Sequence, residues 1–189
     1  MSFADKLSIL RILLIPLFVS LLFYFNQERL YLRYIVLAVF VIAVLSDFLD
    51  GLVARIKKEK SKIGQVVDPL ADKLLLLAAF ISLYALRNAL PLKHQLPLSM
   101  VLVVVSRDLV ILLGVGILYF LKIEISISPT ILGKLTTFFQ MFTILALLTD
   151  FFLFPLIWKI ALIFTLISGV DYFLRGVKAI NAKNNPSSV

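Results

Sequence analysis

The sequence predicts an all-α membrane protein, a polytopic bundle of six transmembrane helices. Of its 189 residues, 61% are hydrophobic and 16% are charged, and the mean hydropathy is +1.05. Soluble domains are about 45–50% apolar and about 25% charged, so a soluble fold of this length could not bury so much apolar surface. The sequence also lacks the period-two alternation of a transmembrane β-barrel, which leaves helices as the spanning structure.

Six apolar runs follow one another along the chain and are separated by short polar joints. Each run has about 20 residues, enough for a helix to cross an apolar layer of about 30 Å. The predicted spans are residues 7–25, 32–56, 65–86, 98–121, 131–149 and 155–177. We expect them to form one domain, residues 1–180, and we expect the polar segment 181–189 to be a frayed tail.

The basic residues predict the orientation, because lysine and arginine concentrate on the cytoplasmic side of membrane proteins. With six spans, twelve basic residues lie on one side, Arg11 among them. The other side holds Arg29, Arg33, Arg87, Lys93 and Lys159. Both termini are therefore expected to be cytoplasmic. The first run is too long for the apolar region of a cleaved signal peptide, so we expect none.

Six of the 11 acidic residues fall inside the apolar runs. They are Asp47, Asp50, Asp68, Asp72, Asp108 and Asp171. A charge at the centre of the bilayer costs at least about 2.5 kcal/mol, even on the most lenient scales. We therefore expect these carboxylates to face the interior of the bundle and to be compensated by a cation or by protons.

Four of these aspartates lie on two helical stripes, each with small residues beside them. The stripes are Asp47, Asp50, Gly51 and Ala54 in the second run and Gly64, Asp68 and Asp72 in the third. A short loop joins the two runs, so the stripes can face each other and form a four-carboxylate cluster. No cysteine or histidine is near, which favours Mg²⁺, Mn²⁺ or Ca²⁺ over zinc. The small residues leave room for a large ligand or for close helix packing, and both interpretations fit the spacing.

The same residues spell the signature of a known family. CDP-alcohol phosphatidyltransferases carry Asp-x2-Asp-Gly-x2-Ala-Arg-x8-Gly-x3-Asp-x3-Asp. All eight positions match here, at Asp47, Asp50, Gly51, Ala54, Arg55, Gly64, Asp68 and Asp72. The chain resembles this family over essentially its whole length. Segments 68–73, 106–108, 129–140 and 168–172 look most like the phosphatidylglycerophosphate synthase branch of the family.

The resemblance implies a reaction and a role for each aspartate. Asp47, Asp50, Asp68 and Asp72 would bind divalent metal, two Mg²⁺ or Mn²⁺ ions, at the pyrophosphate of CDP-diacylglycerol. Asp72 would also take the proton from the hydroxyl of glycerol 3-phosphate. That hydroxyl attacks the phosphorus that carries diacylglycerol, and CMP leaves. We further expect a homodimer among the lipids of a bacterial plasma membrane, with the active site facing the cytoplasm and no nucleic-acid partner.

The two substrates would have separate binding residues. The resemblance implies a CDP-lipid site of Asp50, Gly51, Ala54, Arg55, Ser61, Gly64 and Asp68. The acceptor carries a phosphate dianion and needs cations, so we assign Arg107, Lys134, Arg175 and Lys73 to it. Other interpretations stay open at this point. Arg107 could pair with Asp108 or Asp171, and Lys134 and Arg175 could reach lipid headgroups instead.

Competing functions remain to be separated by experiment. Within the family, a cardiolipin synthase would use the same aspartates with phosphatidylglycerol as acceptor, and inositol phosphate or serine are further acceptors. A cation or proton transporter would use intramembrane carboxylates as relay sites, but such folds usually show broken helices or internal repeats. In a structural membrane adaptor, buried carboxylates would only be a cost. Metal-dependent release of CMP separates the enzyme from both non-enzymes.

Overall fold

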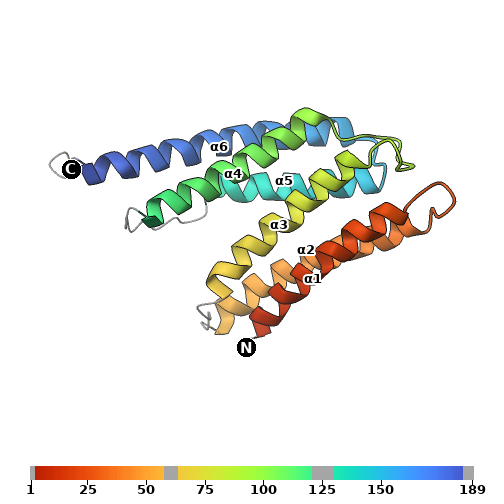
Figure 1. Cartoon of the computed structure of the whole chain (residues 1–189), viewed down its shortest axis with the longest axis horizontal. Helices are drawn as coiled ribbons and strands as arrows, with labels where there is room; N and C mark the ends of the chain where they lie inside the picture. Colours follow the sequence, from red (N-terminus) through yellow and green to blue (C-terminus); the bar gives the residue numbers. More distant parts are fainter. Residues whose placement is uncertain (1–2, 58–63, 121–129, 185–189) are drawn as a thin grey trace. The chain divides into compact units, whose positions relative to one another are not determined.

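The structure, a computed structural model, is helical in all the regular elements it describes (Figure 1). It describes residues 3–57, 64–120 and 130–184, and it describes side chains at 9–46, 73–114 and 130–178. The helices are α1 (Phe3–Tyr24), α2 (Leu32–Lys57), α3 (Gly64–Ala85), α4 (Leu98–Phe120), α5 (Ile131–Leu148) and α6 (Phe154–Asn184). Two compact units emerge. Unit 1 comprises Met1–Pro97 and Ile144–Phe154, and unit 2 comprises Leu98–Thr143 and Pro155–Val189.

The helix boundaries confirm the apolar runs as structural elements. The ends of α2, α3, α4 and α5 agree with the predicted spans to within one residue. Two helices extend beyond their predicted spans. Helix α1 begins at Phe3, four residues before the predicted start, and α6 continues to Asn184, past the apolar run and into the segment predicted to be a tail. Alanine and lysine in that segment are favourable helix formers, so a helix can extend beyond the apolar residues. Residues 185–189 lie outside the described part.

Unit 1 is held together by α1, which packs against both α2 and α3. Phe18 of α1 lies against Phe40 of α2, with the ring centroids 5.7 Å apart. Around this contact the buried core contains Leu22, Val36, Ala43, Ala79, Phe80 and Leu83. Figure 1 shows that the start of α1, the end of α2 and the start of α3 gather at one end of this unit.

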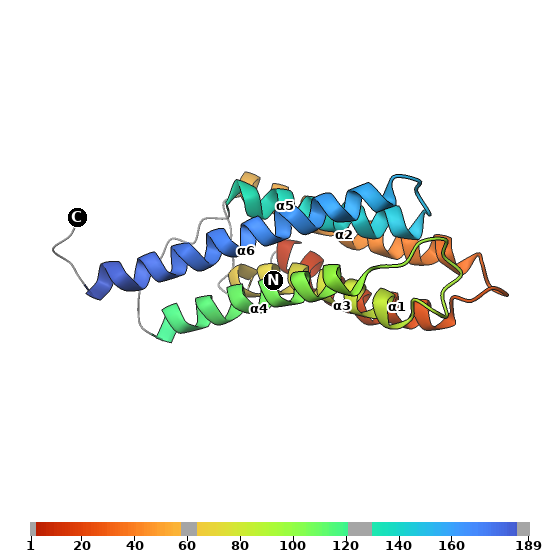
Figure 2. The ribbon, with the colours of Figure 1, turned by 90° about the horizontal axis from the view of Figure 1, so that it is seen from above.

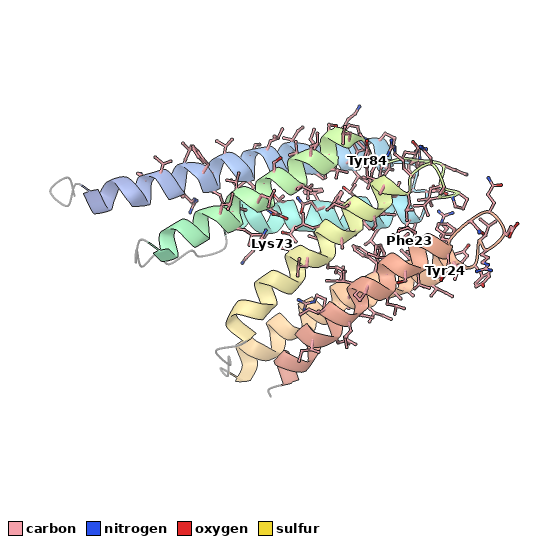
Figure 3. All side chains as sticks on the ribbon, viewed as in Figure 1. Phe23, Tyr24, Lys73 and Tyr84 are labelled. Carbon is pink, nitrogen blue, oxygen red and sulfur yellow. The ribbon has the colours of Figure 1, made fainter. Side chains whose placement is uncertain are left out.

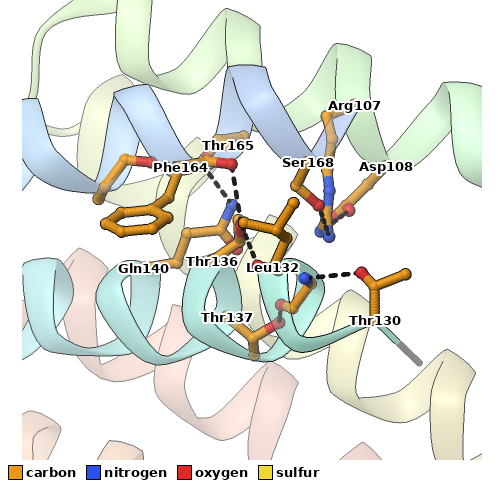
Figure 4. Close-up of polar contacts among 12 residues, drawn as sticks. Arg107, Asp108, Thr130, Leu132, Thr136, Thr137, Gln140, Phe164, Thr165 and Ser168 are labelled. Carbon is orange, nitrogen blue, oxygen red and sulfur yellow. Dashed lines mark hydrogen bonds and ion pairs between the residues drawn. The ribbon is translucent and has the colours of Figure 1, made fainter. Parts of the chain in front are cut away.

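Unit 2 contains α4 with most of α5 and α6, and its interior is partly polar. Thr136 of α5 donates a hydrogen bond to the carbonyl oxygen of Phe164 on α6, at 3.0 Å. One turn along, Gln140 donates to the Thr165 hydroxyl at 3.1 Å, and both side chains are buried. The two helices can be followed in Figure 2, and their polar contacts in Figure 4. Such hydrogen bonds join helices in an apolar solvent, where the hydrophobic effect between helices is weak.

Large apolar side chains cover much of the outer surface in the described residues. Examples on four of the helices are Leu13, Phe23, Tyr34, Phe138 and Phe173, all more than half exposed. Exposed apolar surface on this scale favours lipid over water as the surrounding solvent. Within the part of the chain that the structure describes, two stretches are suited by length and composition to crossing a membrane, Ile131–Leu148 and Phe154–Lys178.

The connections of unit 1 meet at one carboxylate, Asp150. It sits in the turn between α5 and α6 with φ at 51°, a left-handed conformation that aspartate tolerates better than most residues. Its side chain pairs with Arg33 at 2.9 Å and accepts the backbone N–H of Lys93 at 2.8 Å. Arg33 also donates a hydrogen bond to the carbonyl oxygen of Leu148. Asp150 thus joins the start of α2, the α3–α4 connection and the α5–α6 turn.

Replacing Asp150 by alanine should therefore destabilise the protein. Asp150→Ala removes an ion pair and a charge-assisted hydrogen bond, and we expect a loss of about 2 kcal/mol. At this chain length that loss lowers the melting temperature by roughly 4–8 °C, measurable by thermal unfolding in detergent. Asp150→Asn retains an acceptor and tolerates the same φ, so it should lose less. Equal melting temperatures for the wild type and Asp150→Ala would contradict this role.

Candidate active site

The acidic motif lies on two helices of unit 1 that both pack against α1. Asp47 and Asp50 are in the last three turns of α2, and Asp68 and Asp72 are in the first three turns of α3. At about 1.5 Å per residue, Asp50 lies about 10 Å from the end of α2, and Asp72 lies about 12 Å from the start of α3. The two helix ends lie at the same end of unit 1 (Figure 1). The backbone therefore places the two pairs at similar depths.

The remaining motif residues follow the same two helices. Gly51, Ala54 and Arg55 belong to α2, and Gly64 is the first residue of α3. Ser61 lies outside the described residues, as do the side chains at 47–57 and 64–72. The four-carboxylate cluster and the nucleotide pocket therefore remain predictions.

The donor set fits a divalent metal ion on chemical grounds. Four carboxylates offer the hard oxygen ligands that Mg²⁺, Mn²⁺ and Ca²⁺ prefer. Among the side chains that the structure describes, no three histidine, cysteine, aspartate or glutamate residues come close enough to hold a metal. The described side chains therefore offer no alternative metal site to the motif.

Two basic side chains that the structure describes in unit 1 lie in the first three turns of α1 and α3. Lys73 follows Asp72 directly on α3, and its side chain is half-buried (Figure 3). Arg11 of α1 was predicted only as one of the basic residues on the cytoplasmic side. Its side chain is instead completely enclosed, with 0% of its surface exposed. The sequence feature that could have indicated this burial is the position of Arg11 within an apolar run, between Leu10 and Ile12.

In unit 2, Arg107 is the centre of a buried polar cluster. Its guanidinium pairs with Asp108 at 2.8 Å and donates to the Ser168 hydroxyl at 3.1 Å (Figure 4). Arg107 and Asp108 are only 6% and 1% exposed. Of the two partners considered for Arg107 from the sequence, the structure selects Asp108. The Tyr172 ring lies beneath the guanidinium, with its centroid 5.7 Å from Cζ.

The other two predicted acceptor residues of unit 2 are more exposed. Lys134 is on the surface near the start of α5. Arg175 is 59% exposed and donates from Nε to both carboxylate oxygens of Asp171, at 3.0 Å each. Asp171 is therefore compensated by a residue one turn away on its own helix. Its side chain is 25% exposed, so the predicted interior position is confirmed for Asp108 and only partly for Asp171.

Two glycines allow close packing around Arg107 and Tyr172. A Cβ atom on Gly133 would lie 3.1 Å from the Tyr172 hydroxyl and 3.2 Å from Oγ1 of Thr130. A Cβ atom on Gly169 would lie 3.4 Å from Cγ of Arg107. Small residues at these positions let the start of α5 and the middle of α4 approach α6.

Adding a methyl group at Gly133 should strain this packing. We expect Gly133→Ala to lower the melting temperature by several degrees, because overpacking a tight contact costs about 1–3 kcal/mol. Gly114→Ala is the matched control, because nothing lies within 4 Å of its Cβ and alanine favours a helix. Adding Tyr172→Phe to Gly133→Ala should restore part of the loss. If both glycine variants behave alike in thermal unfolding, the close approach is wrong.

Comparison with known proteins agrees with the motif. The family model for CDP-alcohol phosphatidyltransferase matches residues 1–170. The chain is 32% identical to a CDP-diacylglycerol–glycerol-3-phosphate 3-phosphatidyltransferase of Aquifex aeolicus, over 95% of this chain and 98% of that protein. It is 30% identical to the Bacillus subtilis protein of the same name, over 95% and 97%. It is also 30% identical to a probable phosphatidylglycerophosphate synthase of Mycobacterium tuberculosis, over 99% and 87%.

Proposed function

We propose, because the chain belongs to the CDP-alcohol phosphatidyltransferase family, that it makes phosphatidylglycerophosphate. It transfers the phosphatidyl group of CDP-diacylglycerol to the hydroxyl of glycerol 3-phosphate and releases CMP. The carrying observation is near-full-length similarity to bacterial proteins named for this reaction, combined with an intact eight-residue signature on α2 and α3. The protein is therefore a transferase of phospholipid biosynthesis.

The chemistry needs charge neutralisation and a base rather than a nucleophilic side chain. Asp72 takes the proton of the acceptor hydroxyl as the bond between its oxygen and the β-phosphorus forms. The bond between that phosphorus and the oxygen of CMP breaks, and CMP carries away the electron pair. Asp47, Asp50, Asp68 and Asp72 would hold divalent metal, which we propose to be two Mg²⁺, and the metal would supply positive charge for the pyrophosphate and the leaving CMP.

The helix ends that carry the motif also suit the nucleotide. Gly51 and Ala54 lack bulk on the same stripe of α2 as the aspartates, which leaves room for cytidine beside the backbone. Arg55 and Ser61 would supply donors to the CDP group, with Gly64 at the start of α3. Asp50 and Asp68 would contribute to this site as well as to metal binding.

We assign the acceptor phosphate to basic residues outside the signature. Arg107 supports the assignment because Asp108 and Ser168 fix its guanidinium, while its Nε has no hydrogen-bond partner among the described residues. Lys134 is exposed and available to an anion from solution. Arg175 would exchange part of its contact with Asp171 for the phosphate, and Lys73 would supply charge next to Asp72.

The membrane arrangement follows from the same proposal. Six spans place both termini and the motif end of α2 and α3 on the cytoplasmic side of a bacterial inner membrane. The lipid substrate would then enter from the cytoplasmic leaflet and glycerol 3-phosphate from the cytoplasm. We also propose a homodimer, the assembly suggested by similarity to the family.

CMP release by the purified protein tests the reaction. With CDP-diacylglycerol and Mg²⁺, we expect release with glycerol 3-phosphate and none with phosphatidylglycerol, inositol phosphate or serine. EDTA should stop the reaction, and Mg²⁺ should restore it. Asp72→Asn should lower the rate by at least about 10²–10⁴-fold, the contribution of a general base. Asp150→Asn, a change of the same chemistry outside the motif, should leave the rate close to that of the wild type.

Each alternative outcome has a defined meaning. Release with phosphatidylglycerol alone would make the protein a cardiolipin synthase with the same mechanism. Release with inositol phosphate or serine would likewise change the acceptor and keep the motif's roles. No release with any acceptor would reopen the transporter and adaptor hypotheses.

The acceptor assignment predicts a selective change in KM. Arg107→Gln, Lys134→Gln and Arg175→Gln should each raise KM for glycerol 3-phosphate by about tenfold or more, because each removes a charge-assisted hydrogen bond of about 1.5–3 kcal/mol. KM for CDP-diacylglycerol should change little. Lys159→Gln is the control, because Lys159 is an exposed lysine that lies near the Trp158 ring. An unchanged KM for glycerol 3-phosphate in all three variants would refute the assignment.

A further inference from the structure

The buried arginine of α1 lies on the helix face that packs into unit 1. Arg11, Phe18 and Leu22 are spaced by seven and four residues, so they form one stripe, and all three are buried. Leu10, Ile12 and Leu13, the residues beside Arg11, are exposed. The guanidinium therefore points into the unit rather than toward lipid or headgroups.

The contact between Phe18 and Phe40 fixes the register of α1 against α2. The two helices are joined by a short connection and run antiparallel (Figure 1). Arg11 lies seven residues before Phe18, toward the start of α1. Asp47 lies seven residues after Phe40, toward the end of α2. Both steps cover about 10 Å and about two helical turns, so each returns to the stripe on which it began. Position 11 of α1 is therefore opposite position 47 of α2.

A completely enclosed guanidinium needs anions around it, because burying a charge without compensation is expensive. Asp50 and Asp72 also lie at this depth, about 10–12 Å from the helix ends that gather there. Metal-binding carboxylates in turn are usually oriented by hydrogen bonds from a second residue. An arginine presents several N–H donors in a rigid plane, which suits the second oxygen of a carboxylate.

We propose that Arg11 of α1 is a positioning residue of the phosphatidyl-transfer site. Its guanidinium holds the carboxylate of Asp47 on α2 in the orientation that binds metal. The inference rests on the proposed function. It adds a third helix to a site that the signature confines to α2 and α3. An ion pair that serves only stability would place the same residues together, so the test must measure metal binding separately from folding.

Binding of Mn²⁺ to the protein in lipid nanodiscs, followed by electron paramagnetic resonance without substrate, makes that separation. Arg11→Gln should weaken Mn²⁺ binding by about 10–100-fold, the usual effect of losing an outer partner of a metal ligand. Arg11→Lys keeps the charge without the planar fork, so its affinity should be intermediate. In the CMP assay the Mg²⁺ concentration for half-maximal rate should rise in the same order, while KM for glycerol 3-phosphate stays unchanged.

Arg33→Gln is the matched control, because it breaks an arginine–aspartate pair of unit 1 outside the motif. It should lower the melting temperature and leave Mn²⁺ affinity unchanged. Unchanged or tighter Mn²⁺ binding in Arg11→Gln would overturn the proposal, and tighter binding is expected if Arg11 only repels the metal. Should Arg11→Gln fail to fold, wild-type affinity in Arg11→Lys would overturn it equally. A wild type that binds Mn²⁺ but releases no CMP would refute the proposed function instead.

Discussion

The cost of a charge in an apolar interior governs the polar architecture of this protein. Water cannot compensate a buried ion here, so each one needs an opposite charge or hydrogen bonds from the protein. Arg107 with Asp108 follows this constraint in the interior, and Arg33 with Asp150 follows it where the carboxylate is buried; the third described pair, Arg175 with Asp171, is more exposed. In each pair one partner is an arginine, whose charge persists at any physiological pH and whose planar group forms several bonds. The acidic motif places four aspartates on two neighbouring helices, and the proposed divalent metal would compensate their charge.

The same solvent explains how the helices recognise one another. Apolar side chains gain little by leaving lipid for a protein interior, so contact depends on close packing and interhelical hydrogen bonds. Gly133 and Gly169 provide the close packing at Tyr172 and Arg107. Thr136 and Gln140 provide the hydrogen bonds between α5 and α6. Polar residues within the apolar runs therefore serve helix association in the described part of this fold, and we propose a second, chemical use for those of the motif.

Much of this organisation was predictable from the sequence, and the omissions have a common cause. Apolar runs of spanning length located the helices, because an apolar solvent imposes that length. The signature located the aspartates, because its spacing repeats along two helices. Neither pattern shows which side chains contact one another in the folded protein. Arg107 had two possible aspartate partners until the structure showed Asp108. Arg11 was assigned to a membrane side by counting basic residues, and only helix packing revealed its burial. The end of α6 was missed because the apolar run stops before the helix does.

The proposed roles divide the reaction between two kinds of residue. The signature accounts for metal, the CDP group and the base, which every acceptor requires in the same form. It contains no cation for the acceptor's own phosphate except Arg55, which the nucleotide would occupy. The choice of acceptor must then depend on residues outside the signature. Among these residues, buried cations are the strongest candidates, because burying a charge costs free energy. Arg107 is held by Asp108 and Ser168 in a fixed orientation, which suits recognition of a small anion better than a flexible surface lysine would. A change of acceptor within this fold would therefore be expected at Arg107 and its neighbours before any change in the aspartates.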